Sequence, residues 1–356
     1  MIPLGFELGS GRAIAIPPAH TVFVGQTQRA GKTTTLEACA VRSGYSCLAF
    51  LTKRGEASFR LAREIPPYYS DDFFDWEIVR DVCLALTGAR WGEFQRQAGR
   101  VICEEGEIGT PGKPSFVSWP RPENFAELEE NIAIALPKAS GRMKMSLIEV
   151  RADVRKARRE LDRLQVRAAD PELELGLNVV NLEAERPHIQ SLVISSMMNH
   201  LRQRESRSIV CLPEAWKFTD SRRRTPVGEA ARQFIREGAA LHNFLWIDSQ
   251  TLAGLSGELL AQIRVWLFGV QRYKAEIEKT LDAIPDNIFP RPSRGDIANL
   301  KLGQFVLAFD GELLPVYVQP VWMSASHAQA IACGEELIES ARDILEEFDG
   351  AADNVQ

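Results

Sequence analysis

The sequence predicts an α/β fold with a mainly parallel sheet, and three observations support this. An apolar, β-branched stretch at residues 20–25 ends in glycine, a helical pattern follows at 32–44, and a second apolar stretch occupies 46–52. Strand, loop, helix and strand form a βαβ unit, which implies parallel strands covered by helices on both faces. The same alternation returns after residue 170. The composition, 45% hydrophobic and 25% charged, is that of a globular protein.

The second half of the chain repeats the alternation of strand and helix. We expect four strands, at 177–182, 208–216, 243–250 and 264–270. Helices are expected at 187–204 and 228–241, and a hairpin is expected from "GQFVLAF" and "LLPVYVQPVW". The tail "EELIESARDILEEFDG" has the pattern of an acidic amphipathic helix.

Residues 57–170 differ in character and suggest a mainly helical insertion. "FFDWEIVRDVCLALTG" has helical periodicity, and the charged run at 147–170 predicts a long helix. Its basic residues alternate with Glu and Asp, so this helix either has a solvated face or faces DNA or another subunit. The predicted core has two parts, at 1–56 and 171–325. The helical insertion occupies 57–170, and the C-terminal acidic helix occupies 326–356.

The composition excludes several classes of protein. A net charge of −6 argues against a surface that coats nucleic acid everywhere, although local basic patches remain compatible with it. The six cysteines form no CxxC pair, so we expect reduced, mostly buried thiols in a cytoplasmic protein. The N-terminus lacks the pattern of a secretory signal, and no stretch approaches the ~18 apolar residues of a membrane span. No membrane partner is therefore expected.

The segment "VGQTQRAGKTTT" at 24–35 resembles a phosphate-binding loop. Gly31, Lys32 and Thr33 match the end of the motif, but Gln26 stands five residues before Gly31, where glycine is expected, and Gly25 is one residue too early. Because the segment lies between a strand and a helix, we interpret it as a working but variant loop, which either has Gln26 in the glycine position or carries one extra residue after Gly25. Lys32 would contact phosphates and Thr33 would hold Mg²⁺. The predicted nucleotide-binding residues are Gly25, Gln28, Arg29, Ala30, Gly31, Lys32, Thr33 and Thr34.

Two later strand ends carry polar residues that suit phosphoryl chemistry. In "IVCLPEAWKF", Glu214 follows an apolar strand and is the candidate general base. Pro213 stands where a metal-supporting Asp is expected, and proline offers no side-chain acceptor. In "LWIDSQ", Gln250 lies at a strand end where many ATPases with a phosphate-binding loop have a polar residue that senses the γ-phosphate.

In this order, the motifs resemble the HerA–FtsK family of hexameric DNA-pumping ATPases, over roughly residues 18–56 and 175–320. "PEAWKF" is similar to the family's Asp-Glu-Ala-His-Arg-Phe, and His20 with "VFVGQT" is similar to its entry to the phosphate loop. "LTKRGEA", with Thr52 in place of an Asp, resembles its second-strand segment, and "LKLGQFVLAF" resembles its late strand. Only about 18 residues precede the first expected strand, so the N-terminal β-barrel of HerA proteins is expected to be absent.

The resemblance implies a RecA-like P-loop NTPase core that binds ATP and Mg²⁺, assembles as a homo-hexamer and moves double-stranded DNA. It assigns the phosphates to Lys32, the metal to Thr33, water activation to Glu214 and γ-phosphate sensing to Gln250. Arg232 and Arg236 are the candidates for an arginine that completes a neighbouring subunit's site. "SRRR" at 221–224 would reach DNA phosphates or the adjacent subunit, or form a solvated loop.

Two other functions remain open on the sequence. Pro213 favours a weakly hydrolysing, nucleotide-gated ring or scaffold that serves a partner such as a nuclease. A P-loop kinase acting on a small molecule is less consistent with the late polar strand and the absence of an obvious lid.

Overall fold

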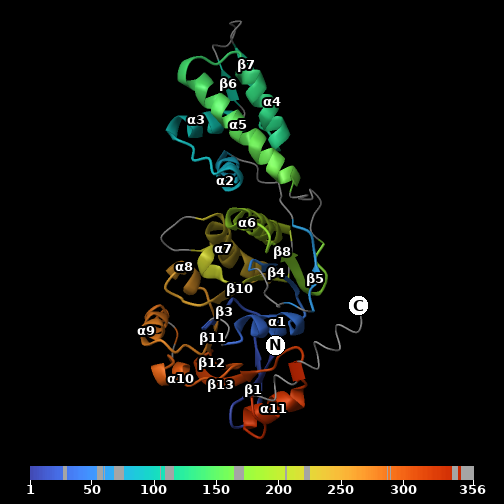
Figure 1. Cartoon of the computed structure of the whole chain (residues 1–356), viewed down its shortest axis with the longest axis vertical. Coiled ribbons are helices and arrows are strands. Elements are labelled where there is room, and N and C mark those ends of the chain that lie inside the picture. Colours follow the sequence, from blue (N-terminus) through green and yellow to red (C-terminus); the bar gives the residue numbers. More distant parts are fainter. Residues whose placement is uncertain are drawn as a thin grey trace. The chain divides into compact units, whose positions relative to one another are not determined.

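The computed structural model describes residues 1–26, 30–53, 59, 61–67, 76–104, 106–108, 116–163, 172–204, 207–219, 225–286, 288, 290–338 and 344–345. The chain divides into two compact units (Figure 1). The sheet unit comprises Met1–Ile65, Glu172–Ala184 and Met198–Gln356, and the helical unit comprises Pro66–Pro171 and Glu185–Met197.

The sheet unit is built on one sheet that has eleven strands among the described residues. The strands lie in the order β2 (Ala13–Ile16), β1 (Ile2–Glu7), β13 (Glu312–Val318), β12 (Gln304–Phe309), β11 (Val265–Gly269), β3 (Thr21–Val24), β10 (Phe244–Ser249), β9 (Ser208–Leu212), β4 (Ser46–Leu51), β8 (Gly176–Asn181) and β5 (Arg63–Glu64). The seven strands from β11 to β5 are parallel to one another. The predicted α/β class with a mainly parallel, RecA-like sheet is therefore confirmed.

The remaining strands form an antiparallel extension beyond β11. The predicted hairpin is confirmed as β12 and β13, and β13 pairs with β1. The strands β1 and β2 were not expected from the sequence, because Pro3 and Gly5 interrupt the first apolar stretch. A Cβ on Gly5 would lie 2.1 Å from the Tyr317 carbonyl oxygen, so glycine allows β13 to approach closely.

Helices cover the sheet from both sides, which explains why its central strands β11, β3, β10 and β9 are buried throughout. The helix α1 (Lys32–Arg42) packs against β1, β3, β8 and β10, and α7 (Pro226–Glu237) packs against β10. A buried cluster joins Leu36 and Cys39 of α1 to Phe23 of β3 and Trp246 of β10. The other helices that begin in the sheet unit are α8 (Gly257–Leu260), α9 (Lys274–Asp282), α10 (Arg294–Ala298) and α11 (Ala325–Cys333).

The C-terminal region departs from the expected pattern where it is described. The helix α11 begins and ends before the acidic tail, and it stops at Gly334, whose φ of 80° is left-handed. Residues 335–338 are not helical, and most of the predicted tail helix lies outside the described residues. The six cysteines are confirmed as free thiols, and five of them are buried.

The helical unit has its own core. It contains α2 (Trp76–Thr87), α3 (Glu93–Cys103), β6 (Gly106–Ile108), β7 (Val117–Trp119), α4 (Phe125–Ala135), α5 (Gly141–Arg163) and much of α6 (Pro187–Arg204). The predicted long charged helix is α5, which begins before residue 147 and buries Leu147, Val150 and Val154. Among the helices described, none is long and apolar enough to cross a membrane.

His20 connects β3 to β10 through a buried hydrogen bond. The amide of Leu245 donates to His20 Nδ1 at 3.0 Å, and the ring packs edge-on against Phe244. Burial disfavours the charged imidazolium and lowers the pKa of His20 to about 4. Because the unfolded chain protonates His20 near its ordinary pKa of 6.5, it binds more protons than the folded chain between these values.

We therefore predict that the free energy of unfolding falls by about 3 kcal/mol between pH 7 and pH 4 through His20, since one pKa unit corresponds to about 1.4 kcal/mol. His20→Asn, which keeps an acceptor, should remove this part of the pH dependence. Chemical denaturation across this range measures it, with exposed His242→Asn as the matched control. An unchanged slope in His20→Asn would show that His20 is not the titrating group.

Candidate phosphate site at the start of helix α1

The predicted phosphate loop lies between β3 and α1, as its motif requires. Gly31 caps α1 with a φ of 70°, a left-handed conformation that glycine adopts without strain. At the other end, the Gly25 amide donates to the Ser249 carbonyl at 3.3 Å, and the Gln26 amide donates to the Val270 carbonyl at 2.8 Å. The loop therefore begins with its backbone fixed to the chain segments on either side of β3. The predicted binding residues Gln28 and Arg29 lie outside the described residues, as does the 221–224 segment.

The packing around Gly25 explains the unusual spacing of the motif. A Cβ on Gly25 would lie 2.9 Å from the Cβ of Ala30 and 3.2 Å from the backbone of Gly269. The position of Gly25 therefore has no room for a side chain, whereas the next residue, Gln26, carries one. Gly25 thus takes the close-packed place at the start of the loop, and the loop to Gly31 is one residue longer than the consensus.

The first turn of α1 presents the backbone amides of its first residues and the side chains of Lys32 and Thr33. Lys32, Thr33 and Thr34 are the first three helical residues, and Gly31 provides no side-chain cap for their amides. The start of a helix of this length attracts anions through these amides and the helix dipole. Ala30 and Lys32 are both buried, so the ammonium of Lys32 is withdrawn from bulk water.

Asp248, which sequence reasoning did not identify, lies against this turn. Its Oδ1 is 3.6 Å from Lys32 Nζ, and its Oδ2 accepts a hydrogen bond from Thr33 Oγ1 at 3.3 Å. The side chains of Lys32 and Asp248 are only 5% and 2% exposed. The available signal was an acidic residue inside an otherwise apolar strand, two positions before Gln250.

Glu214 and Gln250 are brought together at the ends of β9 and β10. The Gln250 amide nitrogen lies 3.0 and 2.8 Å from the two carboxylate oxygens of Glu214, and Trp216 Nε1 donates to one of them at 2.6 Å. Glu214 has a φ of 51°, a strained value for a residue with a side chain and one that is common at functional sites.

The surroundings of Glu214 keep its carboxylate ionised. Burial alone would raise its pKa, but the hydrogen bonds from Gln250 and Trp216 and the charges of Lys217 and Lys32 outweigh burial and lower it. The chain thus holds a charged acceptor near the phosphate loop.

The oxygen donors near the loop suit a hard cation. The hydroxyl of Thr33 and the carboxylate of Asp248 are hydrogen-bonded to each other, and Mg²⁺ prefers oxygen ligands while keeping part of its water shell. The residues present therefore fit the Mg²⁺ ion expected with ATP.

The arginine candidates lie on α7 and are paired with carboxylates of the same chain. Arg232 contacts Glu229 at 2.7 Å and lies 4.0 Å from Glu258, and Arg236 is paired with Glu258. The Arg236 side chain is 62% exposed, against 20% for Arg232. A role in a neighbouring subunit's site stays a prediction for both.

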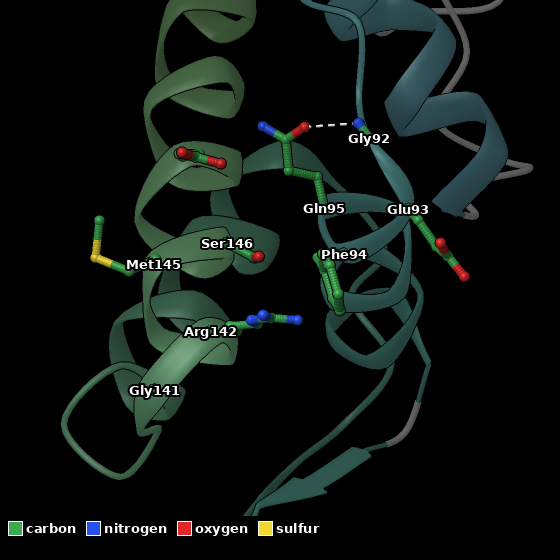
Figure 2. Close-up of a pocket in the computed structure, with 9 residues that line it drawn as sticks. Gly92, Glu93, Phe94, Gln95, Gly141, Arg142, Met145 and Ser146 are labelled. Atoms are coloured by element: carbon green, nitrogen blue, oxygen red, sulfur yellow. Dashed lines mark hydrogen bonds between the residues drawn. The ribbon is translucent and has the colours of Figure 1, made fainter.

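A separate hollow lies on the helical unit between α3 and α5 (Figure 2). There the guanidinium of Arg142 lies over the Phe94 ring, and the Gly92 amide donates to Gln95 Oε1 at 2.7 Å. None of the predicted site residues lines this hollow.

Comparison with solved structures supports the interpretation of the fold. The chain is similar to VirB4 of Thermoanaerobacter pseudethanolicus, with a TM-score of 0.61 and 14% identity over 89% of this chain and 97% of that one. It is also similar to the plasmid coupling protein TrwB in two nucleotide-analogue complexes, each with a TM-score of 0.53 and 12% identity. These matches cover 86% and 90% of this chain, and 88% and 91% of TrwB.

Comparisons at the sequence level add no relative: no family model matches the chain, and neither does any curated protein. At 12–14% identity, the structural matches establish the fold. The resemblance to the HerA–FtsK ATPases inferred from the motifs is confirmed at the level of the fold.

Proposed function

We propose that the chain is an ATPase that moves double-stranded DNA as a ring of six subunits. The observation that carries the proposal is the meeting of two groups at one edge of the sheet. Lys32 and Thr33 start the helix that follows β3, and the hydrogen-bonded pair Glu214 and Gln250 follows β9 and β10. These three strands are parallel neighbours, so their carboxyl ends lie together, where ligands of such sheets bind.

Each group has a defined task in ATP hydrolysis. The amides of α1 and the ammonium of Lys32 hold the β- and γ-phosphates, and Thr33 is the side chain that holds Mg²⁺. When bound, Mg²⁺ would supply positive charge that neutralises the phosphates. Glu214 accepts a proton from the attacking water while the water oxygen forms a bond to the γ-phosphorus. The bond from the γ-phosphorus to the bridging oxygen breaks, and ADP and phosphate form.

Gln250 and Trp216 are positioning residues for Glu214 in this scheme. Their N–H groups hold the carboxylate in one orientation at a strained backbone position. The γ-phosphate of ATP would compete for the same Gln250 amide. This gives a physical basis for sensing, because the hydrogen bonding of the base then depends on the nucleotide.

The proposal of DNA as the substrate rests on the fold and the motif order. TrwB, which shares the fold, is a plasmid coupling protein whose structures hold GTP and ATP analogues. A net charge of −6 implies that DNA would contact a local basic lining of the ring. Arg236 is the better candidate to reach a neighbour's nucleotide, because its side chain is the more exposed of the two.

The competing function is a nucleotide-gated scaffold that hydrolyses ATP weakly and serves a partner such as a nuclease. Pro213 favours it, since the strand that carries Glu214 offers no carboxylate for the metal. ATP turnover and its response to DNA distinguish the two functions.

We predict that the purified chain hydrolyses ATP and that linear duplex DNA stimulates turnover. Lys32→Ala should abolish nucleotide binding, and Glu214→Gln should slow turnover by roughly a hundredfold or more while binding persists. Lys274→Ala, at an exposed lysine on α9, is the matched control and should leave turnover unchanged. Native mass spectrometry with ATP should show six copies. Binding without turnover, with or without DNA, would contradict the motor and favour the scaffold.

We also predict how turnover depends on pH. Hydrolysis requires ionised Glu214, so activity is lost as pH falls through its lowered pKa. Gln250→Leu removes hydrogen bonds that lower this pKa, and it should move the acid limb of the kcat profile toward neutral pH. Gln262→Leu, on the exposed surface, should leave the limb in place. An unchanged limb in Gln250→Leu would show that these hydrogen bonds do not tune the base.

A further inference from the structure

We propose that Asp248 supplies the metal-supporting carboxylate that Pro213 cannot, so that the acid has moved from β9 to the neighbouring strand β10. The inference rests on the proposed function, because it concerns the Mg²⁺ that accompanies ATP. Asp248 would then serve the metal in a nucleotide site where proline, at the end of β9, occupies the usual position of the acid.

The register of the sheet makes this exchange possible. The strands β9 and β10 are parallel neighbours, with Trp246 opposite Cys211 and Ile247 opposite Leu212. Continued by one residue, the register places Asp248 beside Pro213. Side chains opposite each other in a parallel pair point to the same face, and Cys211 and Trp246 both belong to the cluster under α1. The carboxylate therefore stays on the face of α1 and moves by one strand, about 4.8 Å.

The move brings the carboxylate closer to the phosphate loop. The strand β10 lies between β9 and β3, and Asp248 is opposite Phe23, one residue before the last residue of β3. From this position it accepts a hydrogen bond from Thr33, the side chain assigned to Mg²⁺. A residue at position 213 would start one strand farther from β3.

The charges around Asp248 also suit a carboxylate that changes its partner from Lys32 to a metal ion. The charge of the buried Asp248 carboxylate is balanced by Lys32, whose Nζ lies 3.6 Å from Oδ1. With ATP and Mg²⁺ bound, Lys32 would face the phosphates and Asp248 would face the cation, so neither buried charge would be left without a partner.

Mg²⁺-dependent nucleotide binding tests the assignment without relying on turnover. Calorimetry would measure ATP affinity in Mg²⁺ and in EDTA for the full chain, Asp248→Asn and Glu214→Gln. We expect the parent and Glu214→Gln to bind ATP at least about tenfold more tightly in Mg²⁺, a difference of about 1.4 kcal/mol. Asp248→Asn should bind with one affinity in both conditions. The double variant Pro213→Asp/Asp248→Asn should regain the dependence.

The remaining outcomes distinguish a failure of the Asp248 assignment from a failure of the proposed function. If Asp248→Asn keeps the Mg²⁺ dependence, or the parent shows none, the assignment of Asp248 is wrong and the ATPase proposal stands. If the parent binds no ATP in either condition, the proposed function itself fails.

Pro213→Asp alone tests the same claim without touching Asp248, and so does not depend on Asp248→Asn folding. Because the parent already has its acid, a second one should not tighten binding in Mg²⁺. A gain of about tenfold or more would show that the parent's site lacked a carboxylate and would overturn the proposal.

Discussion

The buried pair of Lys32 and Asp248 ties the start of α1 to the end of β10, and the nucleotide site is arranged around this contact. Removing one partner of such a pair typically costs about 3–5 kcal/mol, because the other charge is left buried. The contact therefore constrains where α1 can begin relative to the sheet. Gly25 and Ala30 pack closely together, so the residues that flank the undescribed part of the predicted phosphate loop lie side by side.

The second constraint is the order of the central strands. Because β10 lies between β3 and β9, its end faces both the phosphate loop and Glu214. Asp248 points to the first of these and Gln250 to the second, two residues apart on one strand. One strand end thus connects the groups proposed to hold the phosphates with the group proposed to activate water. The charge of Lys32 contributes to the lowered pKa of Glu214, which is a further link between them.

The sequence was sufficient to predict the parallel core, because strands such as the one expected at 46–52 have an apolar centre, Cys47 to Leu51, and are followed by clear turn signals. It also singled out Lys32, Thr33, Glu214 and Gln250 by residue type and spacing, and their roles stay predictions. It could not reveal Asp248, since strand order is absent from a linear pattern and an acid at that position has meaning only beside β3 and position 213. The strands β1 and β2 were missed because they are held by pairing that a linear pattern does not show, β1 with β13 and β2 with β1. The role of Arg236 depends on a neighbouring subunit, which one chain does not contain.

The most direct test of this account is a crystal structure of the chain with Mg²⁺ and a non-hydrolysable ATP analogue. The account predicts the phosphates at the start of α1, Lys32 turned from Asp248 to the phosphates, and Mg²⁺ at about 2.1 Å from Thr33 Oγ1. Asp248 should contact the ion or one of its waters. An occupied site in which the Lys32–Asp248 pair is unbroken and the ion lies away from Asp248 would contradict it.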